Sequence, residues 1–452
     1  MSFKDIELSD EQAKAVETLK EFITEGSERC ITLVGAAGTG KTLITKYIID
    51  FLERKGINFV LAAPTHKAKL VLENMSGEKA ETIHRLLSLT PDIDIFELNL
   101  DELQFKSRGE AKFPAHGVVI IDEASMISDD LFDIIMIKAK DYDSKIIFQG
   151  DIKQLNPVKQ GNHSKVFSLE NKITLTKIFR QDSESGVMQY LDVLRENPLK
   201  RNEFETVIKP NGSVVTFDNK KDFFLKAIDS VITAMEEENP MYCKITAWSN
   251  GRVNAWNLKV REYLFKEKAN KIANKGEIIT GCDNITYNNF DFYNSLDYIV
   301  DDVEYKASKY LPNFGEVKGT ILYLYDTVYK DTSDIFVITE PKRVTDRLAE
   351  TIEDLRIRAI KAMPKTKKYW KDYFALINSF ATFCTLKFEN RTIKKRTFTY
   401  GYAMTTHKLQ GSSIDNMFVD LEDICNNPDP EELRQLQYVA LSRTRKNVYI
   451  LK

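Results

Sequence analysis

The segment GAAGTGKT, residues 35–42, has the residue types and the spacing of a loop that binds phosphate groups. Its glycines allow a tight turn in which backbone N–H groups face phosphate oxygens, at a place where a Cβ atom would interfere. Lys41 supplies a positive charge for the β- and γ-phosphates, and Thr42 supplies a hydroxyl that can bind Mg²⁺. We therefore expect the whole loop to hold a nucleotide: Gly35, Ala36, Ala37, Gly38, Thr39, Gly40, Lys41 and Thr42.

Two acids end an apolar run further along the chain, in VVIIDEAS at residues 118–125. Asp122 can hold Mg²⁺ through water, and Glu123 can act as a general base that polarises an attacking water molecule. Acids at a strand end are also common N-caps of the next helix. The phosphate loop upstream favours the catalytic interpretation, so the two segments together predict hydrolysis of a nucleoside triphosphate.

A third polar segment, QGDIKQLNPV at residues 149–158, follows another apolar run. Asp151 and Gln154 are ordinary residues for a turn at a strand end. They can also point at a ligand, because the amide of Gln154 can donate to a γ-phosphate, or contact the attacking water, without acting as a base. A side chain that contacts the γ-phosphate changes position between ATP and ADP states, which would make Gln154 a sensor.

A parallel sheet would bring these three segments to one edge. Short apolar strands are expected at residues 30–34, 59–63, 117–121 and 145–148, with a helix at residues 42–52. Strands that alternate with helices predict a parallel sheet covered by helices on both faces. Ligands of such sheets gather at the carboxyl ends of the strands, where the loop, the acids and Gln154 all lie.

A second α/β series begins near residue 173. Its strands are expected at residues 244–248, 398–404, 417–421 and 447–451, with a helix at residues 254–265. Within it, residues 276–329 contain short aromatic strands typical of a small β-barrel-like insertion, followed by helical, basic sequence to about residue 380. Residues 84–114 alternate like strands and predict an inserted hairpin or small subdomain. The expected fold class is therefore α/β, with two units and two insertions.

Composition restricts the class of protein further. The 452 residues fit roughly three domains, and 43% hydrophobic with 29% charged residues is typical of a soluble protein with packed cores. The sequence has no run of about 18 apolar residues and no secretion signal at its start, so neither a membrane protein nor a secreted one is expected. Its five cysteines are far apart and form no C-x-x-C pair, which favours a reducing cytoplasm over a disulfide framework or a zinc site.

Charge is distributed unevenly along the chain. The net charge of −3 excludes a uniformly basic nucleic-acid binder, but residues 356–396 hold twelve Lys and Arg against two acids, Asp372 and Glu389. Such a basic stretch can attract a polyanion. It can equally form the solvated face of a helix.

Taken in order, the phosphate loop, DEAS and GDIKQLNPV resemble motifs I, II and III of superfamily 1 helicases. Other segments resemble the remaining motifs: LSDEQAKAV with an adenine-reading Gln12, APTHKAK (Ia), TIHRLL (Ib), LTKIFRQ with Arg180 (IV), TTHKLQGSSID (V) and YVALSRTR with Arg443 (VI). AWSNGRVNAWN, residues 247–257, resembles a pattern of the RecD/Dda-type group of superfamily 1B, which includes the phage Dda helicases, with Ser249 in the place of a threonine. The motifs cover nearly the whole chain, while residues 282–355 match weakly.

The resemblance implies two RecA-like P-loop lobes with parallel sheets. Lobe 1A would comprise residues 1–85 and 115–175, the pin subdomain 1B residues 86–114, lobe 2A residues 176–275 and 396–452, and an SH3-like and helical subdomain 2B residues 276–395. It also implies a monomeric DNA helicase for replication, recombination or repair, which uses ATP with Mg²⁺ held by Thr42 and Asp122. The 5′-to-3′ direction comes from the resemblance alone, because both polarities share the core motifs.

Arg180 and Arg443 belong to the second unit, far in sequence from Lys41. The planar, always charged fork of arginine suits the spread negative charge of a γ-phosphate. If ATP lies between two lobes, the loop holds it from one side and these arginines hold it from the other, so ATP binding closes the cleft and hydrolysis opens it. The alternative for Arg443 is an ordinary surface residue of a C-terminal helix.

The expected track is single-stranded DNA. Two Thr-His-Lys triplets follow strands in the two units, and their hydroxyls and cations suit phosphate contacts without sequence preference. The DNA-binding residues expected are Pro64, Thr65, His66, Lys67, Thr82, His84, Phe105, Ser249, Asn250, Thr406, His407 and Lys408. Phe105 is the candidate wedge that stacks on the fork base pair, although a small hairpin also needs a core aromatic. Further expected partners are forked duplex DNA and a single-strand-binding protein, in the cytoplasm of a bacterium or of a phage-infected host.

Other functions share part of these motifs. An ATP-driven translocase would displace proteins from DNA with little unwinding, and a non-catalytic DNA-binding adaptor of a replisome would keep the fold without hydrolysis. The intact set of candidate catalytic residues argues against the adaptor: Lys41, Asp122, Glu123, Gln154, Arg180 and Arg443. A P-loop kinase is the third alternative, and it would lack motifs V and VI.

Overall fold

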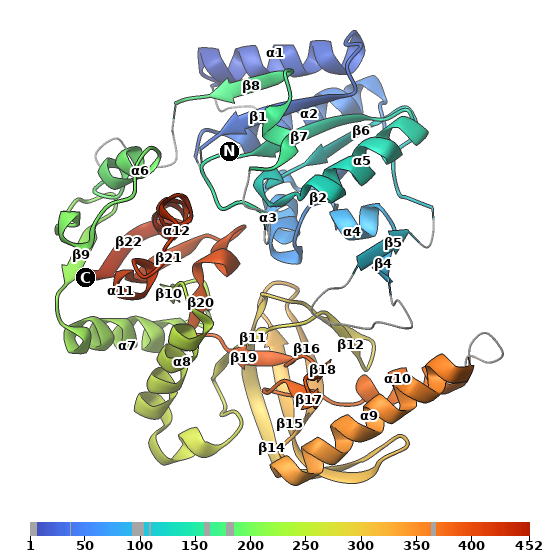
Figure 1. Cartoon of the computed structure of the whole chain (residues 1–452). Coiled ribbons are helices and arrows are strands. Elements are labelled where there is room, and N and C mark those ends of the chain that lie inside the picture. Colours follow the sequence, from blue (N-terminus) through green and yellow to red (C-terminus); the bar gives the residue numbers. More distant parts are fainter. Residues whose placement is uncertain are drawn as a thin grey trace.

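The computed structural model describes residues 7–36, 38–92, 104–107, 110–157, 163–177, 185–362 and 368–452, and three parts meet around a common centre (Figure 1). Lobe 1 runs from α1 (Asp10–Thr24) to β8 (Lys172–Leu175). Lobe 2 runs from α6 (Met188–Leu194) to α8 (Asn250–Phe265) and from β20 (Ala403–Thr405) to β22 (Thr444–Leu451). The insertion, from β11 (Ile278–Gly281) to β19 (Phe398–Tyr400), separates the two stretches of lobe 2.

Lobe 1 contains a six-stranded parallel sheet in the order β3-β2-β6-β7-β1-β8. Its other strands are β1 (Cys30–Gly35), β2 (Phe59–Ala63), β3 (Ala80–Thr82), β6 (Val118–Ile121) and β7 (Lys145–Gly150), so the four expected strands are all present. Successive side chains of a strand point to opposite faces. Accordingly, Ile120 joins a core with α1 and α2 (Lys41–Lys55), whereas Ile121 joins one with α5 (Asp129–Asp141).

Local sequence signals set where the helices of lobe 1 begin. α1 begins with a capping box, in which Ser9 and Gln12 exchange backbone-to-side-chain hydrogen bonds. α2 begins directly after Gly40, while hydroxyls of Thr65 and Thr82 cap α3 (His66–Ser76) and α4 (Ile83–Leu86). The starts of α2, α3 and α4 therefore lie just after β1, β2 and β3, at the carboxyl edge of the sheet.

Lobe 2 contains a five-stranded parallel sheet in the order β20-β10-β21-β22-β9. Its remaining elements are β9 (Val214–Phe217), α7 (Lys220–Glu236), β10 (Cys243–Ala247), β21 (Ile414–Asp420), α11 (Leu421–Ile424) and α12 (Pro430–Ser442). One core joins the sheet to α7 and α8 through Phe223 and Trp256, and another joins it to α6 and α12 through Leu191 and Leu436. A parallel sheet buried on both faces repeats the organisation of lobe 1, which confirms the expected α/β class.

The insertion is built on an antiparallel sheet in the order β16-β15-β14-β11-β19. Its strands β14 (Asp297–Leu311), β15 (Gly315–Asp326) and β16 (Asp331–Ile338) are followed by α9 (Lys342–Ala362) and α10 (Lys368–Ile377). Two hairpins complete it: β12 (Ile285–Tyr287) with β13 (Phe290–Phe292), and β17 (Leu386–Phe388) with β18 (Arg391–Lys394). The expectation of short strands is wrong for β14 and β15, because two register shifts in their pairing interrupt the alternation that marks a strand in the sequence.

The stretch expected as one strand at residues 398–404 is two strands in two sheets. β19 pairs antiparallel with β11 in the insertion, whereas β20 pairs parallel with β10 in lobe 2. The chain crosses between them at Gly401, where a Cβ atom would lie 2.8 Å from Ile278 Cγ2. A buried ion pair of 2.9 Å between Lys244 of β10 and Asp297 of β14 joins the same two parts. The insertion is thus attached firmly to lobe 2.

A hairpin leaves lobe 1 after α4, on the side that faces the insertion (Figure 1). Its strand β4 (Leu89–Asp92) pairs antiparallel with β5 (Gln104–Ser107), which places Phe105 opposite Pro91. Elsewhere, no helix within the described ranges combines the length and the apolar character that crossing a bilayer requires.

Candidate functional site

The phosphate loop lies at the carboxyl edge of the lobe 1 sheet, between β1 and α2. Lys41 Nζ donates hydrogen bonds to the carbonyl oxygens of Gly35 (2.6 Å) and Ala36 (3.0 Å), so the ammonium group lies over the loop. Thr42 follows in the first turn of α2 and lines the cavity beside the loop, which is described below. Ala37, the remaining apolar residue of the loop, lies outside the described residues.

Gln12 supports the loop from the side of α1. Its amide donates to the carbonyl oxygen of Thr39 (3.0 Å), while its carbonyl oxygen accepts from the N–H of Ser9. Gly40 has a φ of 88°, and a Cβ atom at this residue would lie 2.2 Å from Gln12 Nε2. The close approach therefore requires glycine here. It assigns Gln12 a role in holding the loop, beside its predicted contact with adenine.

Two carboxylates reach the cavity from the end of β6. Glu123 has a φ of 53°, an uncommon conformation for a residue with a side chain, and its N–H donates to Asp122 Oδ1 (2.9 Å). Burial raises the pKa of Asp122 to about 6, and the neighbouring charge of Glu123 acts in the same direction. Burial also lowers the pKa of Lys41, although Asp151, Asp122 and Glu123 oppose this change. The acids thus favour an added cation, and the lysine favours added anions.

Arg443 crosses from the end of α12 in lobe 2 to the acids of lobe 1. Its two terminal nitrogens donate to the two carboxylate oxygens of Glu123, at 3.0 and 3.2 Å, and Nη2 also donates to Gln154 Oε1 at 2.6 Å. Burial opposes the charge of Arg443, but the Glu123 carboxylate outweighs it and raises the pKa of the guanidinium. Arg443 is only 6% exposed, so it is no surface residue of a C-terminal helix.

A second bridge joins the lobes at the turn that follows β7. The Tyr438 hydroxyl of α12 donates to Asp151 Oδ2 (2.7 Å), and burial followed by the Asp151 charge raises the pKa of Tyr438, which keeps it a donor. One turn earlier on α12, Gln435 exchanges hydrogen bonds with Asn156. The Asp151–Asn156 turn is therefore a contact surface between the lobes as well as part of the nucleotide site.

The second predicted arginine, Arg180, lies outside the described residues. The segment before it is anchored to lobe 1, because the Glu11 carboxylate accepts hydrogen bonds from the backbone N–H groups of Thr176 (2.9 Å) and Lys177 (3.2 Å).

A cavity of about 290 Å³ joins these groups. Lobe 1 lines it with the phosphate loop, Asp122, Glu123, Gln154 and one side of α3, and lobe 2 lines it with Gly411–Ser413 and Arg443. Lys41 and Arg443 thus face one shared space. Its cationic, acidic and amide groups suit a triphosphate whose terminal phosphate is contacted from both lobes.

Comparison with known proteins shows which proteins the chain resembles. Family models match an AAA domain at residues 7–214 and a UvrD-like helicase C-terminal domain at residues 400–451. The ATP-dependent DNA helicase Dda of Enterobacteria phage T4 is 26% identical over 475 residues, which cover 99% of this chain and 100% of the phage protein. The ATP-dependent RecD2 DNA helicase of Deinococcus radiodurans is 31% identical over 183 residues, which cover 40% of this chain and 23% of that protein.

The chain belongs to the superfamily 1B helicases of the RecD/Dda type. A solved structure of Pif1 helicase from Bacteroides, in complex with ADP-AlF3 and single-stranded DNA, shares its fold, with a TM-score of 0.51 at 19% sequence identity. The match covers 98% of this chain and 92% of the Pif1 chain. The two parallel sheets of this helicase are therefore those of RecA-like lobes, as the motifs predicted.

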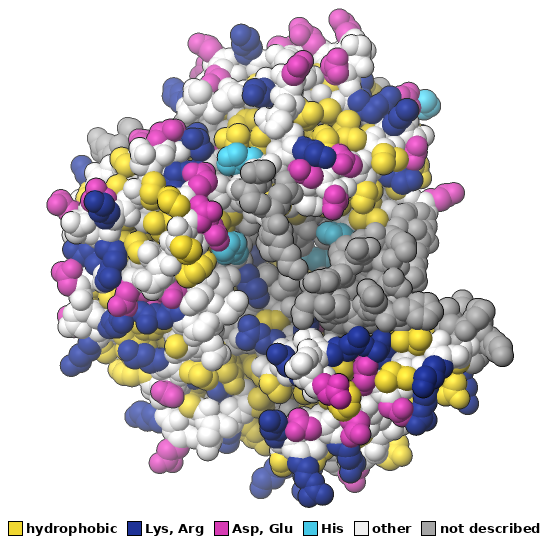
Figure 2. Space-filling view, viewed as in Figure 1, with side chains coloured by type: hydrophobic (Ala, Val, Ile, Leu, Met, Phe, Trp, Pro, Cys, Tyr) yellow, Lys and Arg dark blue, Asp and Glu magenta, His cyan; other side chains and the backbone are white. Residues whose placement is uncertain are grey.

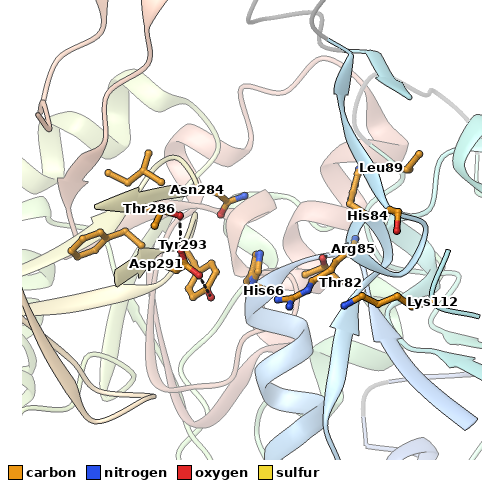
Figure 3. A pocket seen from close by; sticks show the side chains of 13 residues that line it. His66, Thr82, His84, Arg85, Leu89, Lys112, Asn284, Thr286, Asp291 and Tyr293 are labelled. Carbon is orange, nitrogen blue, oxygen red and sulfur yellow. Dashed lines mark hydrogen bonds between the residues drawn. The ribbon is translucent and has the colours of Figure 1, made fainter. Parts of the chain in front are cut away.

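In this helicase, three of the lobe 1 residues expected to contact DNA line a second cavity, of about 580 Å³, between lobe 1 and the insertion (Figure 3). His66, Thr82 and His84 line it from the carboxyl edge of the lobe 1 sheet. Pro64 follows β2, and the Thr65 hydroxyl accepts a hydrogen bond from the N–H of Ala68, so its present contact is the cap of α3.

Lys67 is buried beside the His66 position. Its ammonium nitrogen has no hydrogen-bond partner among the described residues. Burial lowers the pKa of Lys67 to about 8; Asp297 of the insertion opposes the change, and Lys408 of lobe 2 adds to it. The charge of Lys408, in the second Thr-His-Lys triplet, therefore acts on Lys67, and a phosphate bound at Lys67 would favour the charged form of this lysine. Figure 2 shows Lys, Arg and His side chains near this centre, between lobe 2 and the insertion.

The remaining lobe 2 candidates of the helicase make contacts within the protein. The buried Thr406 hydroxyl shares a hydrogen bond with Thr246 (3.0 Å), and His407 Nε2 lies 3.2 Å from Glu432 Oε1. Ser249 caps α8 and its hydroxyl donates to Asp423 (2.9 Å), with Asn250 next to it as the first residue of α8. Their present contacts hold lobe 2 together, so their contact with DNA stays a prediction.

Sequence reasoning missed residues at both cavities. Tyr438 gives no signal in the sequence, because it occupies an apolar position in the pattern of α12. Gln435, three residues earlier, belongs to a polar face of this helix that could have indicated a contact surface. Arg85 and Lys112 line the second cavity from lobe 1, and Tyr293 lines it from the insertion. Only Arg85, next to His84, carried a local signal.

Proposed function

We propose that this chain is an ATP-dependent DNA helicase that moves 5′-to-3′ along single-stranded DNA and separates duplex DNA at a fork. The observation that carries the proposal is the contact of Arg443, from lobe 2, with both Glu123 and Gln154 of lobe 1. A single side chain of lobe 2 therefore contacts both the predicted general base, Glu123, and the predicted γ-phosphate sensor, Gln154, so the positions of the two lobes affect both groups. The relatives named as ATP-dependent DNA helicases support the choice of nucleotide and of track.

The chemistry follows from an exchange of partners. A γ-phosphate offers Arg443 more negative charge than Glu123 does, so its arrival frees the Glu123 carboxylate to accept a proton from the attacking water. Lys41 turns from the loop carbonyls to the phosphates, and the Gln154 amide contacts the γ-phosphate or the water. Before the triphosphate arrives, the base is held by the arginine, which limits hydrolysis to the closed, loaded state.

The acids also fit a metal ion. Thr42 and Asp122 line the same cavity, where burial and the adjacent Glu123 raise the pKa of Asp122, so that a bound cation would stabilise its carboxylate. We propose that these two residues hold Mg²⁺, which when bound neutralises charge on the phosphates.

Movement requires that the lobes close and open while each holds the strand in turn. The Asp151–Asn156 turn meets α12 on the nucleotide side, and His66 and Lys67 of lobe 1 lie on the side of the insertion and of Lys408. Closure therefore changes the distance between the parts that line the strand path. A strand held through its phosphates by both lobes would be advanced once per hydrolysed ATP.

We propose the same division of the chain that the sequence indicated, with the end of subdomain 2B moved from residue 395 to Gly401, since β19 pairs within the insertion. Residues 86–114 form the pin, and Phe105 on β5 is its proposed wedge. The proposal includes a monomer working in the cytoplasm, with forked DNA and a single-strand-binding protein as partners.

The first test is ATP hydrolysis with and without single-stranded DNA. We expect strong stimulation by DNA in the wild type and none in Lys41→Ala. Lys55→Ala is the matched control, because Lys55 is an exposed lysine at the other end of the same helix. A hydrolysis rate that is the same with and without DNA, or a wild-type rate in Lys41→Ala, would contradict the proposal.

The second test separates unwinding from translocation. Duplexes with a 5′ or a 3′ single-stranded tail are compared, and only the 5′-tailed substrate should be unwound. Phe105→Ala should lower unwinding while it leaves displacement of streptavidin from biotinylated single strands unchanged. Equal loss of both activities would exclude a wedge role for Phe105, and displacement without unwinding in the wild type would favour the protein-displacing translocase.

A further inference from the structure

Lobe 1 and the insertion meet in a stack of two aromatic rings at the edge of the second cavity. The rings of His66 and Tyr293 lie 4.1 Å apart between centroids, at an interplanar angle of 29°. In Figure 3, His66 stands between the lobe 1 wall, with Thr82 and Arg85, and the insertion wall, with Tyr293 and Asp291. Because the insertion is attached to lobe 2, this stack joins two parts that move relative to each other.

The Tyr293 ring is held from the side of the insertion. Its backbone N–H donates to the Tyr298 hydroxyl (2.8 Å), and its own hydroxyl donates to Asp291 (3.4 Å). Asp291 also accepts from the Thr286 hydroxyl (2.6 Å), and the ring centroid of Tyr329 lies 6.1 Å from that of Tyr293. One face of a fixed ring is therefore presented to lobe 1.

The stacking contact of His66 with the Tyr293 ring can be replaced by a contact with another ring. Its Nδ1 is buried without a hydrogen-bond partner in the described part of the chain, so the present stack leaves a polar atom unsatisfied. Burial lowers the pKa of His66 to about 4, with Lys69 acting in the same direction, so the ring is neutral near pH 7. An uncharged aromatic pair can be opened without breaking an ion pair.

The cavity around the stack has walls of different chemistry. Arg85 and Lys112 line it from lobe 1; both also lie near Glu81, at 3.2 and 3.0 Å, but their side chains remain 63% and 48% exposed. The insertion contributes Asn284, Thr286 and Tyr293, and Asp291 is the one acid among the described residues that line the cavity. Phosphates suit the cationic wall and bases suit the aromatic one, which is the arrangement of sites that bind single strands.

We propose that Tyr293 is a base-stacking residue of the single-strand path, and that one nucleobase enters between Tyr293 and His66. This inference rests on the proposed function and assigns a subsite to it. Stacked bases lie about 3.4 Å apart, so the two rings must separate by roughly 3 Å to admit one base. The base then bridges lobe 1 and the insertion, and the sugar or phosphate of the same strand, which lies beside the stack, can reach the unsatisfied His66 Nδ1. Any base can stack, so the subsite gives grip without sequence preference.

Equilibrium binding of fluorescent single-stranded DNA tests the inference. Tyr293→Ala should weaken binding roughly 5- to 150-fold, the range expected for loss of one base–aromatic stack. Tyr293→Phe should bind like the wild type, because it keeps the ring and loses only the bond to Asp291. Tyr310→Ala is the matched control, since Tyr310 is another tyrosine of the insertion and is 76% exposed. ATP hydrolysis without DNA should be unchanged in Tyr310→Ala.

A second measurement locates the base. A single abasic site is moved along the oligonucleotide, and wild type should lose affinity at one register that Tyr293→Ala no longer distinguishes. If Tyr293→Ala lowers the thermal unfolding temperature, Tyr293→Leu, which keeps apolar bulk without a ring, replaces it in both assays. Wild-type affinity in the ring-less variant, or an abasic penalty that persists in it, overturns the inference. A wild type that does not respond to DNA at all would instead contradict the proposed function.

Discussion

Tyr438→Phe removes one hydroxyl from the lobe interface and nothing else. The hydroxyl donates to Asp151 Oδ2 across the cleft at 2.7 Å, while the other carboxylate oxygen keeps its bond from the Lys153 N–H. Asp151 is 1% exposed, so water cannot easily replace the lost donor. A hydrogen bond to a charged acceptor contributes about 1.5–3 kcal/mol. The closed arrangement of the lobes should therefore lose stability relative to the open one by roughly 10- to 150-fold.

The assay is steady-state ATP hydrolysis at saturating single-stranded DNA. We expect KM for ATP to rise at least about tenfold with kcat changed less than about threefold, because the bond is made in both the ground state and the transition state. Tyr190→Phe is the matched control: its hydroxyl is also buried, but it donates to the Glu205 carbonyl oxygen (2.9 Å) within lobe 2. That variant should lose stability without a change in KM. Unchanged KM and kcat in Tyr438→Phe would refute the reasoning that this bond helps to hold the lobes closed.

Two further predictions concern charge. Arg443→Lys keeps a positive charge but loses the fork that contacts Glu123 and Gln154. Since an arginine in this role raises kcat by a factor of about 10³–10⁵, kcat should fall at least about a hundredfold. Steady-state ATP hydrolysis at saturating DNA measures this change. Lys67, with a pKa lowered to about 8 by burial, is charged below that pH and neutral above it. A bound phosphate favours the charged form and so raises the pKa, and affinity for single-stranded DNA should fall roughly tenfold between pH 7 and 9.

Each of these predictions has a control in the chain. Arg445→Lys, at an arginine that is 56% exposed and 3.8 Å from Asp415, should leave kcat unchanged. An equal effect in both arginine variants would show that Arg443 acts only through its charge or its packing. Lys67→Arg should bind DNA equally at pH 7 and 9, since arginine stays charged. A pH dependence that persists in this variant would assign the titration to another group and remove Lys67 from the strand path.

The local signals of the sequence were sufficient wherever chemistry depends on neighbouring residues. The phosphate loop, the acids after β6 and the start of α2 need only a strand, a turn and a helix in succession, and all three lie where the sequence predicted them. The resemblance to motif VI, rather than a local signal, predicted Arg443 at the nucleotide site. It could not predict that Arg443 would bind Glu123, because that contact joins residues 320 positions apart.

The expectations that were wrong share one physical cause, which is pairing between distant segments. Residues 398–404 look like one strand, and only the partners β11 and β10 show that they belong to two sheets. β14 looks like several short strands because its register shifts move successive side chains out of alternation. Tyr293 gave no signal either, since an aromatic residue in an Asn-rich hairpin is ordinary until His66 is found opposite it.

The helix α3 links the two cavities and gives the coupling between ATP and DNA a physical route. Its first residue, His66, lies at the strand cavity, and Ala68, Val71, Leu72 and Met75 line the nucleotide cavity. Leu70, between them, packs into the core of the insertion. Lobe 2 also touches this helix at Gly411, where a Cβ atom would approach Ala68 Cβ to 3.0 Å. A helix of eleven residues is about 16 Å long and bends little. A shift of lobe 2 on the proposed exchange of Glu123 for a γ-phosphate at Arg443 would therefore act on α3 through Gly411, and the attached insertion would change the position of Tyr293 relative to His66.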